Sequence, residues 1–192
     1  MTIEHPKQKF PRINPWRILS WSIAAGLLLL PLVAMQFTDE VDWTVLDFAF
    51  AAVLIGGVGL TLEFVFRTTR NAAQRIATGL LLAASFLLIW INAAVGIIGN
   101  EDNPLNLLYG GVLLIAFGGT IVARFRPRGM VRAMAATAVV QTLVGAVAVF
   151  AGGNDPPGAG GAILLNGFFV VMFAGSAWLY RAAAADDARY AD

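Results

Sequence analysis

The sequence has no cysteine, and its one histidine, His5, lies in a polar segment ahead of the first apolar stretch. Paired-histidine haem sites, iron–sulfur clusters, thiolate metal sites, redox dithiols and histidine-based catalytic triads all need residues that the apolar part of this chain lacks. No two carboxylates stand at a spacing typical of acid–base catalysis. The sequence therefore predicts no cofactor and indicates a protein that is not an enzyme.

Charge is also scarce, because only 13% of the 192 residues are charged and 58% are hydrophobic. A soluble domain has roughly a quarter charged residues. A membrane helix needs about 20 mostly apolar residues, and no β-barrel alternation is present. We therefore predict an all-α integral membrane protein whose six transmembrane helices form three hairpins. The expected spans are 17–36, 44–66, 76–98, 105–124, 130–152 and 161–180.

These spans form one membrane domain over residues 1–192, with short polar tails at 1–15 and 182–192 that cannot build a core. A cleaved signal peptide over residues 1–36 is the alternative for the first span, but Val33–Gln36 is a poor cleavage site. Similar positions recur about every 57 residues, which suggests a hairpin repeat. Any three hairpins with basic ends would give the same pattern, so both explanations stay open.

The basic residues predict the orientation of the helices. With the N-terminus inside, every lysine and arginine falls in an inside segment, and the outside connections carry only acidic charge. This positive-inside pattern predicts that both termini are cytoplasmic. Eleven arginines against two lysines, with abundant alanine and glycine, suggest a GC-rich bacterial genome. Trp43, Trp90 and Tyr109 are expected at the outer interface. The basic residues are Lys7, Lys9, Arg12, Arg17, Arg67, Arg70, Arg75, Arg124, Arg126, Arg128, Arg132, Arg181 and Arg189.

Several polar residues lie in the outer halves or the middle of the expected spans and in one outer connection. They suggest an outward-facing polar cavity with an acidic rim, suited to a hard cation such as Ca²⁺, Mg²⁺ or Mn²⁺. The alternative is that amides bond between helices and that outside loops simply avoid basic residues. Which metal would bind, if any, stays unknown. The candidate binding residues are Asp47, Asn92, Glu101, Asp102, Asn106, Gln141 and Asn166.

Three local patterns bear on these candidates. Asp47, if buried and unpaired, could exchange protons as transporter carboxylates do, whereas a shallow position would leave it wetted. Asp102 or Asn103 could cap a helix that begins at Pro104, which leaves Glu101 and Asn106 unexplained. In the fifth span a small and polar stripe predicts close helix packing. That stripe consists of Thr137, Gln141, Gly145 and Ala148.

The inside loop 124–129 is densely basic, reading Arg-Phe-Arg-Pro-Arg-Gly, and Arg132 follows it. We interpret it as an orientation signal in contact with anionic lipid headgroups. Nothing else in the sequence supports nucleic-acid binding.

Segments 36–43, 90–104 and 123–130 resemble parts of small, uncharacterised six-span bacterial inner-membrane proteins of about this length. That group has no assigned activity, so the resemblance implies a bacterial inner membrane and no mechanism. The three-hairpin plan is also similar to six-span acid-resistance membrane proteins of the HdeD type. This second likeness is architectural only, because the acidic tips have no counterpart there.

Two functions remain in competition on the sequence. The first is a small transporter or ion-binding protein that uses the outward-facing cavity. The second is a non-catalytic accessory or assembly subunit that packs against a membrane partner or a second copy of itself. An intramembrane enzyme ranks last.

Overall fold

A computed structural model describes residues 15–100, 102–151 and 158–189, which contain six α-helices, one short 3₁₀ helix and no strand. Six helical segments are long and apolar enough to cross a membrane. The expected all-helical class is confirmed, and six apolar helices of this length are compatible with a multi-pass membrane protein. The orientation of the helices and their arrangement as hairpins stay predictions. The elements are α1 (Pro15–Ala34), α2 (Val45–Thr68), α3 (Ala72–Ala94), η1 (Pro104–Leu107), α4 (Leu108–Ala123), α5 (Pro127–Ala151) and α6 (Gly158–Arg189).

The chain forms two compact units that divide within α2, at Thr61 and Leu62. In the first unit, α1 and α2 approach each other where a tryptophan meets a glycine. A Cβ added to Gly59 would lie 3.4 Å from the nearest ring carbon of Trp21. The glycine therefore leaves space for the indole ring.

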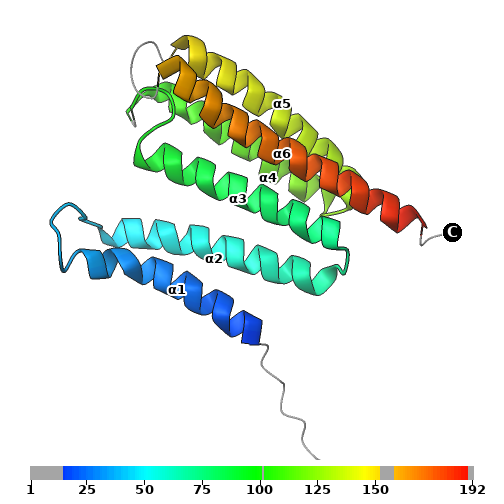
Figure 1. The fold of residues 1–192 in the computed structure, drawn as a ribbon, viewed down its shortest axis with the longest axis horizontal. Helices are drawn as coiled ribbons and strands as arrows, with labels where there is room; N and C mark the ends of the chain where they lie inside the picture. Colours follow the sequence, from blue (N-terminus) through cyan, green and yellow to red (C-terminus); the bar gives the residue numbers. More distant parts are fainter. Residues whose placement is uncertain (1–14, 101, 152–157, 190–192) are drawn as a thin grey trace, which may run out of the picture. The chain divides into compact units, whose positions relative to one another are not determined.

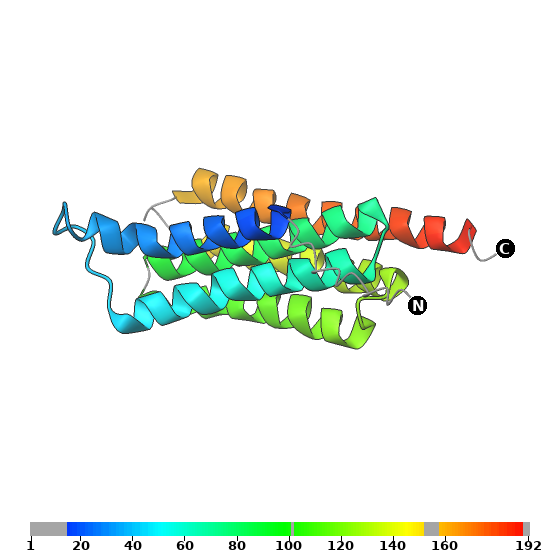
Figure 2. The same cartoon turned by 90° about the horizontal axis from the view of Figure 1, so that it is seen from below.

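In the second unit, helices α3 to α6 run side by side as a bundle (Figures 1 and 2). Helix α6 packs against both α5 and α3, and α4 packs against α5. Although α3 and α4 follow each other in sequence, they make few contacts. The main partner of α3 is therefore α6, which lies far from it in the sequence.

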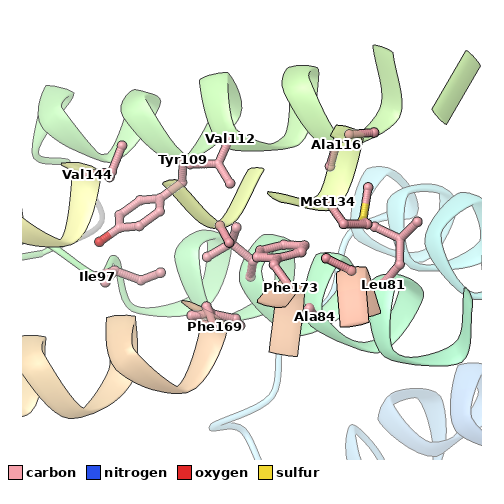
Figure 3. Close-up of a cluster of buried hydrophobic side chains, with 14 of the residues drawn as sticks. Leu81, Ala84, Ile97, Tyr109, Val112, Ala116, Met134, Val144, Phe169 and Phe173 are labelled. Carbon is pink, nitrogen blue, oxygen red and sulfur yellow. The ribbon is translucent and has the colours of Figure 1, made fainter. Parts of the chain in front are cut away.

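Large side chains from all four of these helices fill the core of the bundle, several of which are drawn in Figure 3. Leu81 of α3, Tyr109 of α4 and Met134 of α5 belong to one buried cluster with Phe169 and Phe173 of α6. Burial of such side chains within the bundle depends on close packing, because lipid is as apolar as the core.

Hydrogen bonds also join α3 to α6. The hydroxyls of Thr78 and Tyr180 lie 2.7 Å apart, and Ser176 Oγ donates to the carbonyl oxygen of Ala77 at 2.9 Å. All of these groups are buried. Bonds of this kind satisfy polar groups that a membrane interior could not hydrate.

Helices α4 and α5 approach each other closely at a glycine of α4. A Cβ added to Gly119 would lie 2.7 Å from Cβ of Ala133, whereas one added to its neighbour Gly118 would meet no atom within 4 Å. The close approach of α4 and α5 therefore needs glycine at position 119 and not at 118.

We expect Gly119→Ala to lower the free energy of unfolding by about 1–2 kcal/mol, because overpacking exceeds the gain in helix propensity. Gly118→Ala is the matched control and should be neutral or slightly stabilising. Unfolding in mild detergent, followed by circular dichroism, compares the two variants. Equal stability of the two would contradict the close contact.

Candidate functional site

Asp47 lies in the first turn of α2 and is exposed. Its Oδ2 accepts hydrogen bonds from the backbone nitrogen of Thr44 at 2.7 Å and from the Thr44 hydroxyl at 2.8 Å. The Thr44 hydroxyl accepts in turn from the Asp47 nitrogen at 3.4 Å. This reciprocal pattern resembles a capping box and gives Asp47 a role at the start of its own helix. Asp47 is therefore not the buried, unpaired acid that proton exchange would require.

Asn106 is buried and closes the connection between α3 and α4. Its Oδ1 accepts from the backbone nitrogens of Ile97 and Ile98 at 3.0 and 2.9 Å. Its Nδ2 donates to the carbonyl oxygens of Asn100 at 2.6 Å and Ile98 at 3.4 Å. The Asn106 amide thus satisfies several backbone groups of the turn. This explains why a polar residue stands at this position, which helix capping alone did not explain.

Asn92, half-buried in the last turn of α3, donates from Nδ2 to the backbone oxygen of Asn106 at 3.2 Å. The structure therefore brings two of the predicted site residues together, through a contact that ties α3 to the following turn. Asn103 caps η1 by accepting from the Leu105 nitrogen at 3.0 Å, with Pro104 in the first turn as expected. Asp102 is exposed, and Glu101 lies outside the described residues.

Gln141 of α5 and Asn166 of α6 also meet, in the interior of the bundle. Gln141 Nε2 donates to Asn166 Oδ1 at 2.8 Å, and the Tyr109 hydroxyl donates to the same oxygen at 3.0 Å. Asn166 Nδ2 donates to the carbonyl oxygen of Ala162 at 2.9 Å. All three side chains are buried. This Tyr109–Gln141–Asn166 cluster links α4, α5 and α6 through one acceptor oxygen.

Tyr109 is the member of this cluster that the sequence analysis missed. We expected it in an aromatic belt at the outer interface, but its side chain is fully buried within the bundle and does not face the lipid. In the sequence, a tyrosine near the end of an apolar span looks the same whether it faces the membrane interface or is buried between helices. The polar stripe of the fifth span is better predicted, since Thr137, Gln141, Gly145 and Ala148 are all buried in α5.

Gly145 lets α5 approach the cluster closely. A Cβ at this position would lie 2.8 Å from Cβ of Asn166. Beside this contact, α5 and α6 border an open groove of about 350 Å³. Its lining is almost wholly apolar and comprises Thr142, Gly145, Ala146, Val149, Ile163, Asn166, Gly167 and Val170.

The predicted outward-facing cavity with an acidic rim has little to support it in this part of the chain. Residues 15–100, 102–151 and 158–189 contain no group of three or more histidine, cysteine or acidic side chains that could hold a metal ion. The groove that they do form is lined by one of the seven predicted residues, Asn166, whose side-chain oxygen is already bonded. Within the described residues, the candidate amides act in helix packing and turn formation.

Comparison with protein families matched no family model, and neither the curated proteins nor the solved structures that were searched gave a match. The resemblances noted from the sequence therefore rest on the quoted segments alone.

We expect Asn106→Ala to lower the free energy of unfolding by about 2–4 kcal/mol, because two buried N–H groups lose their acceptor. Asn100→Ala is the control, since its side chain is exposed and only its backbone oxygen is used. Denaturation of the purified protein in mixed micelles measures both. A loss as large in Asn100→Ala would contradict the role assigned to the Asn106 amide.

The cluster predicts unequal effects at its two amides. Asn166→Ala removes the acceptor of two buried donors and should cost about 2–3 kcal/mol. Gln141→Met removes one bond, worth about 0.6 kcal/mol between membrane helices. It also removes Oε1, which is buried and has no hydrogen-bond partner among the described residues. We expect its cost to stay below about 1 kcal/mol. The same unfolding assay tests the order, and a larger loss in Gln141→Met would reverse our assignment of the central acceptor.

Proposed function

We propose that this protein is a non-catalytic accessory protein of a membrane, which packs through its α5–α6 groove against a transmembrane helix of a partner protein. The observation that carries the proposal is a contrast between the bundle's polar side chains and its surface groove. The polar side chains are mostly hydrogen-bonded within the protein, which indicates a scaffold. The groove is apolar and open, which offers a surface for a helix.

Hydrogen bonding among the candidate residues supports a scaffold. Asp47 caps α2, Asn106 holds the turn between α3 and α4, and Asn166 accepts from two neighbouring helices. Such bonds stabilise the protein and leave these groups little capacity to bind an ion. Two candidate oxygens, Asn92 Oδ1 and Gln141 Oε1, are buried without a hydrogen-bond partner among the described residues, but no acidic side chain groups with them into a metal site there.

The chemistry of the groove supports a helix as its occupant. Gly145, Ala146 and Gly167 are three of its eight lining residues. Small residues let the backbones of membrane helices approach closely, which improves van der Waals packing and weak C–H···O contacts. Open space surrounds Gly167, since a Cβ there would meet no atom within 4 Å. A partner helix could therefore reach the backbone of α6 at this point.

A photo-crosslinking amino acid at Val170 tests the proposal in native membranes. Val170 lines the groove, whereas its neighbour Val171 is 71% exposed and does not line it. We expect a discrete protein adduct from position 170 and none from position 171, because only the first would face the partner helix. Mass spectrometry identifies the captured protein.

A matched pair of glycine substitutions controls this experiment. A Cβ at Gly167 or at Gly110 of α4 would meet no atom within 4 Å, so a leucine should fit at either position. Gly167→Leu should abolish the adduct, because Gly167 lines the groove. Gly110→Leu should leave the adduct intact, because Gly110 does not line it. Lipid adducts alone, or equal capture at 170 and 171, would count against a partner helix. An adduct with a second copy of the chain would replace the accessory role by self-assembly.

A further inference from the structure

A basic patch remains that neither the core nor the groove explains. It consists of Arg70 in the α2–α3 turn, Arg124 and Arg126 in the α4–α5 turn, and Arg128 and Arg132 at the start of α5. All five are exposed. Because most of them lie where apolar helices end, they belong at the level of lipid headgroups.

Within the part of the chain that the structure describes, the side chains of the basic patch have no protein partner, unlike those of Arg67, Arg75 and Arg189. Arg67 pairs with Glu63, and Arg189 with Asp186 at 3.9 Å. Arg75 donates to the carbonyl oxygens of Thr69 at 2.9 Å and Phe66 at 3.0 Å. In contrast, no hydrogen bond or ion pair involves a side chain of the basic patch among the described residues. The charge of the patch is therefore available to an anion.

The backbone of the α4–α5 turn is held in an unusual conformation. Arg124 and Phe125 both have left-handed backbones, with φ of 49° and 56°, which residues other than glycine seldom adopt. The Phe125 ring packs edge-on against Phe64, with ring centroids 5.6 Å apart. This packing helps to hold the turn in place and so to fix where the flanking arginines emerge.

Gln74 joins the two turns that carry the basic patch. Its Nε2 donates to the Phe125 carbonyl oxygen at 3.1 Å, and its Oε1 accepts from the Thr69 hydroxyl at 2.9 Å. Thr69 precedes Arg70 and Phe125 lies between Arg124 and Arg126, so these bonds join the turn that carries Arg70 to the turn that carries the other two arginines. One neutral side chain thus brings arginines from two separate connections to the same end of the bundle.

We propose that the basic patch is a binding site for the headgroup phosphate of an anionic phospholipid. Guanidinium groups bind phosphate oxygens through paired N–H donors. Several guanidinium groups held by one turn can therefore bind the phosphate of one headgroup. The acyl chains of such a lipid lie along the apolar helices below. This site is independent of the α5–α6 groove and of the partner proposed for it.

The test measures lipid binding to the purified full-length protein in mild detergent. Thermal unfolding is followed while dioleoyl phosphatidylglycerol or dioleoyl phosphatidylcholine is added, since these lipids share acyl chains and differ in charge. A ligand that binds only the folded state stabilises it by RT ln(1 + [L]/Kd), so tighter binding at the same lipid concentration gives a higher unfolding temperature. We expect stabilisation by phosphatidylglycerol alone. Equal stabilisation by both lipids would overturn the site, and so would inorganic phosphate binding as tightly as the anionic lipid.

Three charge variants separate a site from diffuse attraction. Arg126→Gln should weaken binding of phosphatidylglycerol by about tenfold or more, and Arg126→Lys by about threefold, because lysine keeps the charge but loses the paired donors. Arg181→Gln removes an exposed arginine outside the patch and should change affinity by less than about twofold. Diffuse attraction instead predicts that Arg126→Gln and Arg181→Gln each weaken phosphatidylglycerol binding by about fivefold. Equal losses of affinity in these two variants would overturn the proposal.

A fourth variant changes geometry without changing charge. Gln74→Leu removes the bonds to Phe125 and Thr69 and keeps every arginine. We expect it to weaken binding of phosphatidylglycerol by about fivefold or more, since the arginines then lose their common placement. Unchanged affinity, measured well below the unfolding temperature, would show that placement is irrelevant and would overturn the site.

Discussion

A membrane interior contains no water to bond polar groups, so each such group must find a partner within the protein. The packing of this bundle depends on that constraint. Asn166 shows it most directly, because its single side-chain oxygen accepts from Gln141 and from Tyr109 and so links three helices. Moving these residues apart would leave two buried donors unpaired. The bundle is therefore held in register by polar contacts as well as by the fit of its apolar side chains.

The same constraint explains why much of the fold can be predicted from the sequence. Apolar runs of membrane-spanning length have to be helices, since only a helix satisfies its own backbone within one segment. Helix contacts are harder to predict. The pairing of α3 with α6 depends on Thr78 meeting Tyr180, about 100 residues apart in the chain. Local periodicity carries no information about such distant partners.

The candidate site was predicted less well than the fold, for a related reason. A buried amide has the same sequence pattern whether it faces a cavity or a neighbouring helix. Asn106 appears in the sequence as a polar residue without an explanation, and only the folded turn brings the nitrogens of Ile97 and Ile98 to its oxygen. Tyr109 was missed because an interfacial tyrosine and a buried one occupy similar places in a span. Glu101 lies outside the described residues, so its part in an acidic rim stays a prediction.

The polar groups of this protein fall into two kinds, and the difference indicates where function should be sought. The amides and hydroxyls within the spans are mostly bonded to one another or to the backbone, so they have little left to offer a ligand. The arginines between α4 and α5 are exposed and have no side-chain partner among residues 15–100, 102–151 and 158–189. The backbone of that turn is held in a left-handed conformation by Gln74 and Phe64. Exposed guanidinium groups on a turn of defined shape can bind a group of opposite charge through paired N–H donors. We therefore infer that this protein acts through its surfaces, with an apolar face toward neighbouring helices and a basic end toward anionic headgroups.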